Sequence, residues 1–542
     1  MAFLLRSPSF YNIKIVTYDS KTNFISLLYL ISKYCCSANL QFCFSCSFQN
    51  VRKIHSLISS KPSQTLRNLF FPWKNGVMGF ARVHKFEIEV HLHKYPILHS
   101  IDRMVSAVLV TTFGFIVWIS TVTAMTVAST TAKAASSILC RVAIIGGGVS
   151  GCASARRLAQ LAPSAEITVY EIGRGPGGRA STRKTRSLPH LYINHGAPYA
   201  DIRSELGKSL LSSLGPSAIA PFPGVRGSLD AASGLFVSDE KDSDGDKPQY
   251  ITGANGEMSQ IASSLVRDIP SIETKYKTMI RGLSRSSNGE WTLLDKNEQV
   301  VGSADWLVVA GSGVAHPRWS KTFGGEPPLI AAEQEHPDPK LREALDAIGE
   351  QEVSPVLAVF FSCSGELARK WLSLDFNVAN VKGSSILSKV MIQGGDGQES
   401  GEKWCSVVLH STEGFAVENS GVYGATSSAA RVGDATSDAS REDTLIEKMA
   451  EALNHIPGMP TIDAHSKELY DYGPVLHRWG NAFPKGDALP EELAFVPSSK
   501  VAFCGDYVAS LEQARFGSFE SALLSGTFAA EKIANEIQTT EQ

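Results

Sequence analysis

Acidic residues are scarce at the start of this 542-residue chain: residues 1–140 contain four Asp or Glu and fourteen Lys or Arg. The net charge of the whole chain is −3, so the remaining residues carry an excess of thirteen negative charges. An acidic body of this size argues against a nucleic-acid partner, because it repels the phosphate backbone. The composition therefore separates a basic leader from an acidic body.

Cysteines are few, and they lack the spacing of a metal site or a disulfide framework. Four of the nine lie close together in the leader, and the other five are scattered through the body. Cys43 and Cys46 have CxxC spacing, but no second pair or histidine cluster completes a zinc site. We therefore predict no metal site, and we expect a reducing compartment.

Residues 1–139 are rich in Ser, Lys and Arg and have irregular apolar runs, which predicts a mostly unstructured leader. Within this leader, residues 34–74 have a composition typical of a transit peptide, which predicts an organelle, the chloroplast, as the location. Residues 104–132 contain no charged side chain and are long enough to cross a bilayer. Three interpretations stay open: a membrane anchor, the apolar part of a cleaved targeting sequence, or leader upstream of a later start at Met104 or Met125. Membrane contact is predicted only through this segment.

A glycine-rich turn follows the first apolar run of the body. Residues 141–145 predict a buried parallel strand, and residues 149–161 predict a helix. Three glycines between and within them fill the GxGxxG positions: Gly146, Gly148 and Gly151. The first lets the strand turn, the second lets a pyrophosphate approach, and the third permits close packing of helix on strand. The free N–H groups at Val149 and Ser150 would face the pyrophosphate.

A second strand, residues 166–170, ends at Glu171, which lies 20 residues after Gly151. An acidic side chain at this place accepts hydrogen bonds from ribose hydroxyls. Strand, glycine turn, helix, strand and acid occur in the order that a dinucleotide-binding βαβ unit requires. They predict an α/β fold with a Rossmann-like domain.

The residues after Glu171 resemble the signature that follows the second strand in the monoamine oxidase superfamily of flavoproteins. The matching run is Gly177-Gly178-Arg179. In that family the glycine pair brings the backbone near the FAD diphosphate, and the arginine lies over it. The resemblance therefore implies that Gly178 and Arg179 bind FAD.

A second FAD signature of the same family stands near the C-terminus. Residues 500–504 predict a short strand that ends in Gly505-Asp506, and a helix is expected over residues 517–537. The resemblance implies that Asp506 binds a ribityl hydroxyl and that the start of the helix, with Phe519, faces the flavin. No cysteine occupies a flavin-tethering position, so FAD is expected to be non-covalent.

Residues 194–199, Asn-His-Gly-Ala-Pro-Tyr, resemble a stretch of the renalases that passes the flavin ring. Asn194 and Pro198 stand where that family has an acid and a glutamine. The resemblance implies that Gly196 and Ala197 lie at the flavin and that Tyr199 lines the substrate cavity.

A segment before the C-terminal signature, His477-Arg478-Trp479, matches the order of elements in the renalases. Renalases transfer a hydride from dihydronicotinamide dinucleotides to flavin N5, and O2 reoxidises the flavin. By this resemblance Tyr199, His477 and Trp479 are the candidate catalytic residues, with His410 as a weaker candidate. The implied partners are a small-molecule substrate and O2.

The predicted domains are discontinuous. The FAD-binding domain, with its parallel sheet and β-meander, takes residues 140–200, 249–315 and 496–540. An interleaved α+β substrate domain takes residues 201–248 and 316–495. Two alternatives remain for the function. One is oxidation of an amine, or desaturation of a carotenoid-type or porphyrin-type substrate, on the same fold. The other is a catalytically silent FAD-binding scaffold.

Overall fold

The computed structural model describes residues 140–184, 188–239, 248–396, 402–435, 438–509 and 514–541, and three short strands before residue 140. These strands, β1 (Ala2–Arg6), β2 (Asn12–Val16) and β3 (Ile88–Glu89), form a small antiparallel sheet. The apolar segment 104–132 and the rest of the predicted leader lie outside the described residues. Within the described part of the chain, no helix is both long enough and apolar enough to cross a membrane.

A six-stranded sheet forms the centre of the first part of the body. Its strand order is β13 (Ile272–Tyr276), β5 (Ala165–Glu171), β4 (Cys140–Ile145), β17 (Trp306–Val309), β24 (Val501–Phe503) and β23 (Phe495–Val496). Only β23 runs antiparallel to its neighbour. The predicted parallel Rossmann-like sheet is therefore present.

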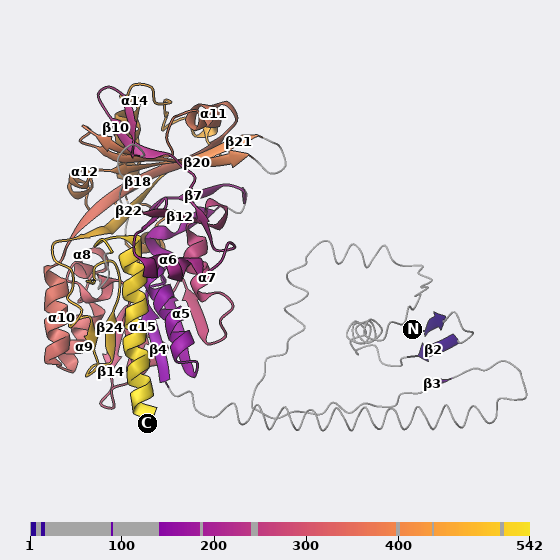
Figure 1. Ribbon diagram of the computed structural model, residues 1–542, viewed down its shortest axis with the longest axis vertical. Coiled ribbons are helices and arrows are strands. Elements are labelled where there is room, and N and C mark those ends of the chain that lie inside the picture. Colours follow the sequence, from indigo (N-terminus) through magenta and orange to yellow (C-terminus); the bar gives the residue numbers. More distant parts are fainter. Residues whose placement is uncertain are drawn as a thin grey trace, which may run out of the picture. The chain divides into compact units, whose positions relative to one another are not determined.

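Helices and a β-meander cover the two faces of this sheet. One face packs against α5 (Val149–Leu161), α7 (Ser259–Val266) and α15 (Phe519–Glu541), and Figure 1 shows α15 lying beside α5. The other face packs against α9 (Pro328–Glu335), α10 (Pro339–Glu350) and the sheet of β14 (Gly282–Arg285), β15 (Trp291–Leu294) and β16 (Val300–Ala304). Burial on both faces explains the unbroken apolar runs of the strands.

A seven-stranded sheet forms the second part of the body. Its order is β11 (Phe236–Ser238), β10 (Arg226–Asp230), β19 (Val378–Lys382), β20 (Leu387–Asp396), β21 (Lys403–Ser411), β18 (Glu352–Ser364) and β22 (Tyr472–Lys485). One face packs against α11 (Gly365–Leu372), α12 (Glu413–Glu418) and α14 (Ala439–Asn454). The opposite face turns toward the βαβ domain (Figure 1), and Ala358, Phe360 and Met391 on it pack against Ile193 of β7 (Tyr192–Asn194).

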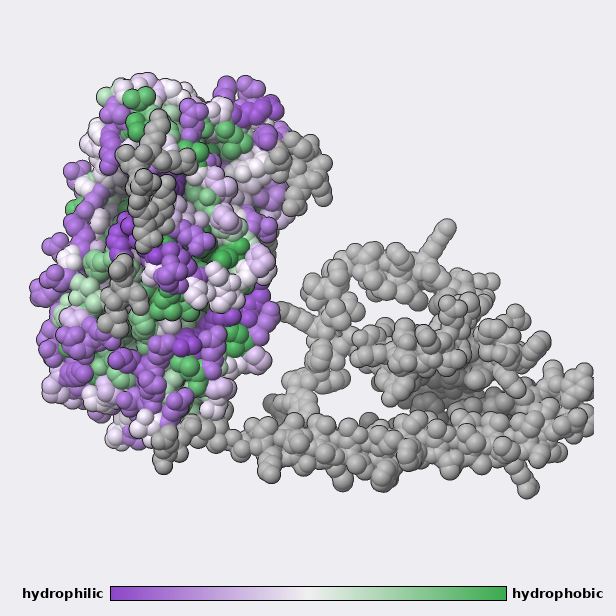
Figure 2. Space-filling view, viewed as in Figure 1, coloured by the Kyte–Doolittle hydropathy of each residue, from purple (hydrophilic) through white to green (hydrophobic). Residues whose placement is uncertain are grey.

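Short elements connect the two parts. β7 pairs with β6 (Thr182–Lys184), and β12 (Gln249–Gly253) pairs with β8 (Ala200–Ile202) and β9 (Ile219–Pro221). The remaining helices are α6 (Glu205–Ser212), α8 (Trp319–Phe323) and α13 (Ser428–Arg431). On the face seen in Figure 2, hydrophilic and hydrophobic residues are interspersed over the body.

Candidate functional site

The glycine turn between β4 and α5 has three glycines in three different surroundings. Gly146 has a φ of +112°, which side chains rarely adopt. A Cβ on Gly151 would collide with the carbonyl oxygen of Gly146. A Cβ on Gly148 would meet no atom within 4 Å. The turn is therefore closed at Gly146 and Gly151 and open toward the cleft at Gly148.

Glu171, at the end of β5, is bonded to the backbone of the turn. Its Oε2 accepts a hydrogen bond from the Gly147 N–H at 2.8 Å, and its Oε1 accepts one from the Gly173 N–H at 2.5 Å. Burial raises the pKa of Glu171, and the two N–H donors oppose that rise. Each oxygen keeps a further lone pair, so the carboxylate can still accept a ribose hydroxyl.

Arg179 and Asp506 join the two predicted FAD signatures. The Arg179 Nη1 and Nη2 each donate to one carboxylate oxygen of Asp506 at 2.6 Å. The Nη1 also donates to the Ala482 carbonyl at 2.8 Å. At the end of β24, the Gly505 N–H donates to the Ser525 hydroxyl of α15 at 2.9 Å. The C-terminal helix is thereby tied to the strand end that carries Asp506.

A single cleft of about 890 Å³ connects these features. That volume is in the range of cofactor and ligand sites. Its lining contains every residue that the sequence predicted for the site except one: Gly146, Gly148, Val149, Ser150, Glu171, Gly178, Arg179, Gly196, Ala197, Tyr199, His477, Trp479, Gly505, Asp506 and Phe519. The exception is Gly151, which packs behind the turn.

One wall of the cleft is formed by the face of the seven-stranded sheet that lies opposite α11, α12 and α14. Lys389 of β20 pairs with His410 of β21, His410 pairs with Ala358 of β18, and Ala358 pairs with His477 of β22. Paired residues on neighbouring strands point to the same face, so these four side chains form one row across the sheet. We call them the cross-strand row. Lys389, His410 and His477 all line the cleft.

His195, in the loop after β7, packs against this row. Its ring centroid lies 5.0 Å from that of His477 and 5.1 Å from that of Trp479. The backbone carbonyl of His195 is bonded to His410 Nε2 at 3.0 Å and accepts from Trp479 Nε1 at 3.2 Å. One loop carbonyl therefore holds His410 and Trp479, and His477 packs against the rings of His195 and Trp479.

All three imidazoles have lowered pKa values. Burial, then Lys389, lowers the pKa of His410 to about 4. Burial, then Arg183 and His410, lowers the pKa of His477 to about 3. Burial, then His477 and Arg183, also lowers the pKa of His195. The rings are therefore neutral near pH 7 and leave this wall uncharged apart from Lys389 and Arg183.

Tyr199 belongs to a different aromatic group of the lining. Its ring centroid lies 5.0 Å from that of Phe222 and 5.3 Å from that of Tyr250. The guanidinium of Arg226 lies 3.3 Å from the Tyr250 ring centroid. Tyr199 and Trp479 therefore have different ring partners, although both pack against the same cluster of buried residues.

Sequence reasoning identified neither Lys389 nor His195 as a member of the site. His195 lies inside a motif that the sequence did single out. Lys389 sits in an ordinary strand, and only the pairing register brings it beside His410. Asn194, which replaces the acid of the renalases, accepts hydrogen bonds from the Thr182 hydroxyl and the Met258 N–H. Its amide therefore stabilises the loop that carries His195.

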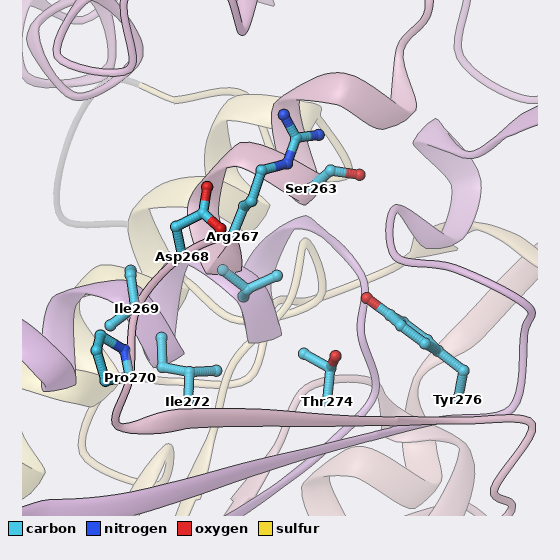
Figure 3. Close-up of a pocket in the computed structure, with 9 residues that line it drawn as sticks. Ser263, Arg267, Asp268, Ile269, Pro270, Ile272, Thr274 and Tyr276 are labelled. Carbon is cyan, nitrogen blue, oxygen red and sulfur yellow. The ribbon is translucent and has the colours of Figure 1, made fainter. Parts of the chain in front are cut away.

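A second, more open groove lies between α7 and β13 (Figure 3). Its volume is about 680 Å³, and its floor is formed by alternate residues of β13, Ile272, Thr274 and Tyr276. Arg267 at its rim donates to Gln260 at 3.1 Å. Among the described residues, no group of three or more His, Cys, Asp or Glu is arranged to hold a metal ion.

Residues 144–205 match the family model described as NAD(P)-binding Rossmann-like domain. No curated protein matches the chain. Three similar solved structures are a candidate protoporphyrinogen oxidase from Exiguobacterium sp. 255-15, cyclohexylamine oxidase from Brevibacterium oxydans IH-35A, and wild-type putrescine oxidase bound to putrescine.

The identities to these three are 13%, 16% and 13%, and the TM-scores are 0.48, 0.43 and 0.43. They cover 73%, 74% and 73% of this chain, and 99% of each of the other chains is covered. Likenesses of this size leave the activity to be argued from the chain's own residues. The body is a two-part α/β protein with a Rossmann-like dinucleotide-binding domain.

Proposed function

We propose that this chain is an FAD-dependent oxidoreductase that takes a hydride from a small reduced nitrogen heterocycle of the dihydronicotinamide type, with O2 as acceptor. One observation carries the proposal. The glycine turn that suits a dinucleotide and the wall of aromatic and imidazole rings line the same continuous cleft. A cofactor held at the first would extend toward a substrate held at the second.

The residues at the turn fit FAD. The open space at Gly148 leaves room for a diphosphate against the backbone, next to the N-terminus of α5. Glu171 is placed to accept ribose hydroxyls, and Arg179 and Asp506 line the cleft farther along. These residues, with Gly178 and Phe519, would hold the cofactor without a covalent bond.

When bound, FAD would supply a ring that accepts the hydride and passes the electrons to O2. The chain's own contribution is to hold and shield the substrate. Trp479, His477 and His195 pack against one another with inclined rings and offer aromatic and imidazole contacts to a heterocycle. Hydride transfer from a dihydropyridine needs positioning more than proton transfer, and neutral imidazoles suit that requirement.

Amine oxidation on the same fold is the alternative reaction. Putrescine oxidase and cyclohexylamine oxidase are named after amines, which those two proteins oxidise. A porphyrin-type or carotenoid-type desaturase and a silent FAD-binding scaffold are further alternatives. The scaffold alternative requires no stacking wall, whereas this cleft has one.

The test is anaerobic mixing of the purified full chain with α- and β-NAD(P)H isomers and, separately, with primary and secondary amines. Flavin bleaching by a dihydronicotinamide isomer and not by amines is the expected result. Admission of O2 should then restore the oxidised spectrum with formation of H2O2. Bleaching by amines alone would favour the amine alternative, and bleaching by none of these compounds would refute the proposal.

Location is a separate proposal, supported by the composition of residues 1–139 alone. We propose import into the chloroplast, with anchoring through residues 104–132 as the alternative. Fusion of residues 1–139 to a fluorescent protein in plant cells tests it, since reticular or plasma-membrane signal would contradict import.

A further inference from the structure

The cleft lining carries many more basic than acidic side chains. Eight Lys or Arg residues line it, against three carboxylates. The carboxylates are already bonded: Asp506 to Arg179, Asp201 to Arg203, and Glu171 to two backbone N–H groups. The diphosphate of a bound dinucleotide would offset about two of the positive charges at the glycine turn. An excess of positive charge therefore remains for the rest of the cleft.

Arg183 contributes to this excess at the wall of the substrate end. Its Nη1 donates to the Tyr472 hydroxyl at 3.0 Å, and its guanidinium lies 5.1 Å from the ring centroid of Phe360. Its Nε is buried without a hydrogen-bond partner. Neutral groups therefore account for its contacts, and no carboxylate of the described residues forms an ion pair with it.

Lys389 is the second such cation, at the end of the cross-strand row. Among the described residues it forms no ion pair. Burial, then the nearby positive charge of Arg515, lowers its pKa, and its charge in turn lowers the pKa of His410. Strand β20 bears Lys389, and strand β18 bears Phe360, the ring over which the Arg183 guanidinium lies. These two strands are two strand spacings, about 10 Å, apart. His410 on β21 thus lies between two unneutralised cations, and His477 and Trp479 lie on β22, the next strand beyond β18.

We infer that the substrate is an organic anion whose carboxylate or phosphate group binds at Lys389, while its ring packs against His410 of the neighbouring strand β21. This inference rests on the proposed function, because it names the substrate class of the same cleft. A protonated amine would be repelled by Lys389 and Arg183, so the same observation disfavours the amine alternative. A neutral ring without an oxyanion would leave the Lys389 charge uncompensated.

The experiment titrates the flavin-loaded full chain with four probes that share one ring: benzoate, phenyl phosphate, benzamide and benzylamine. Calorimetry measures their affinities without any turnover. Benzoate or phenyl phosphate is expected to bind at least about tenfold more tightly than benzamide. Benzylamine is expected to bind more weakly than both the anionic probe and benzamide. Binding of phenyl phosphate alone identifies phosphate as the oxyanion. Affinities for benzoate and for phenyl phosphate that are both no higher than the affinity for benzylamine overturn the inference.

Lys389→Met should lower the affinity for the anionic probe by about tenfold to a hundredfold, because the positive charge is lost. The affinity for benzamide should stay unchanged. Lys389→Arg should retain most of the affinity. Lys382→Met is the matched control, since Lys382 is exposed on the neighbouring strand β19 and does not line the cleft. Unchanged anion binding in a folded, flavin-loaded Lys389→Met protein would contradict the assignment.

The two proposals fail in different ways. Preferential anion binding without bleaching by any dihydronicotinamide isomer would keep the oxyanion subsite and refute the proposed reaction. Bleaching by such an isomer without any preference for anionic probes would keep the reaction and refute the subsite.

Discussion

Arg179 and Asp506, which stand 327 positions apart in the sequence, form a two-bond ion pair in which both N···O distances are 2.6 Å. Asp506 is 4% exposed, so its carboxylate depends on this partner. The pair fastens the segment after β5 to the end of β24. This ion pair therefore joins the two motifs that predicted FAD binding, independently of any cofactor.

Arg179→Met should destabilise the protein by about 2 kcal/mol, because it leaves a buried carboxylate without its cation. This value is below the usual cost for a fully buried pair, because the Arg179 side chain is 38% exposed. Urea unfolding monitored by fluorescence measures the loss. Arg179→Lys should recover only part of it, since an ammonium lacks the two-pronged geometry. An unchanged unfolding free energy in Arg179→Met would show that the pair contributes nothing.

Gly148→Ala and Gly151→Ala should have opposite consequences. The Gly148 Cβ would meet nothing in the chain, so the protein without cofactor should keep its stability within about 0.5 kcal/mol. Its affinity for FAD should fall at least about tenfold, because the methyl group occupies the place of the diphosphate. Gly151→Ala should instead cost about 1–3 kcal/mol of unfolding free energy through overpacking.

The measurements for this pair are urea unfolding of the cofactor-free proteins and titration of each with FAD. Gly313→Ala is a suitable control, because its Cβ would also meet nothing and the residue does not line the cleft. Normal FAD affinity in Gly148→Ala would remove the glycine turn from the cofactor site.

Glu171→Gln should weaken the turn, because the amide places an NH2 group opposite one of two N–H donors. One buried backbone N–H then loses its acceptor, at a cost of about 1–3 kcal/mol. The loss should appear both in the unfolding free energy and in FAD affinity. Glu166→Gln, on the same strand but exposed, is the matched control. Equal effects of the two substitutions would contradict a specific role for Glu171.

The buried histidines should make the protein sensitive to mild acid. His410 and His477 have folded-state pKa values of about 4 and about 3, below the value near 6.5 expected after unfolding. Between pH 6.5 and 4, unfolding therefore takes up protons, and lowering the pH favours the unfolded state. Two such groups contribute a slope of up to about 2.7 kcal/mol per pH unit in that window.

The check is the difference in unfolding free energy between the wild type and the double variant His410→Gln/His477→Gln at pH 7, 6 and 5. As the pH falls, the unfolding free energy of the variant should rise relative to that of the wild type. His465→Gln is the control, because His465 is exposed. Parallel pH dependences for all three proteins would show that the buried rings do not titrate as described.

Trp479→Ala should lower kcat/KM for the dihydronicotinamide substrate by about tenfold to a hundredfold with FAD still bound, because the substrate loses a stacking surface. Trp479→Phe should lose less, since it removes only the hydrogen bond from Nε1 to the His195 carbonyl. Stopped-flow reduction measures both. Equal effects of the two substitutions would indicate that the hydrogen bond, which both remove, and not stacking is the main contribution.

The cofactor end of the cleft could be predicted from the sequence because it is built from local motifs. Helix α5 begins and ends where the residue pattern predicted, and β4, β5 and β24 lie within one residue of their expected positions. The predicted parallel sheet is present with these strands in it. Glycine spacing and apolar strands report on neighbours that are close in the sequence, so they need no tertiary information.

The substrate end depends on strand register, which local patterns do not encode. Residues 472–485 contain Gly, Pro, His and Arg and gave no clear strand pattern, yet they form β22 and place His477 opposite Ala358. Lys389 reaches the cleft only because β20 pairs with β21 at His410. A shift of one residue would turn either side chain to the opposite face, among the packed residues beneath α11 and α14.

By itself, the sequence determined that the chain contains a dinucleotide turn, the acid that follows it and a matching C-terminal strand and helix. Only the tertiary structure decided that Arg179 pairs with Asp506, and that Lys389, His410 and His477 stand in one row over the cleft. The physical reason is the range of the interactions. Turn geometry is fixed by a few consecutive residues, whereas a wall shared by four strands is fixed by the packing of distant segments.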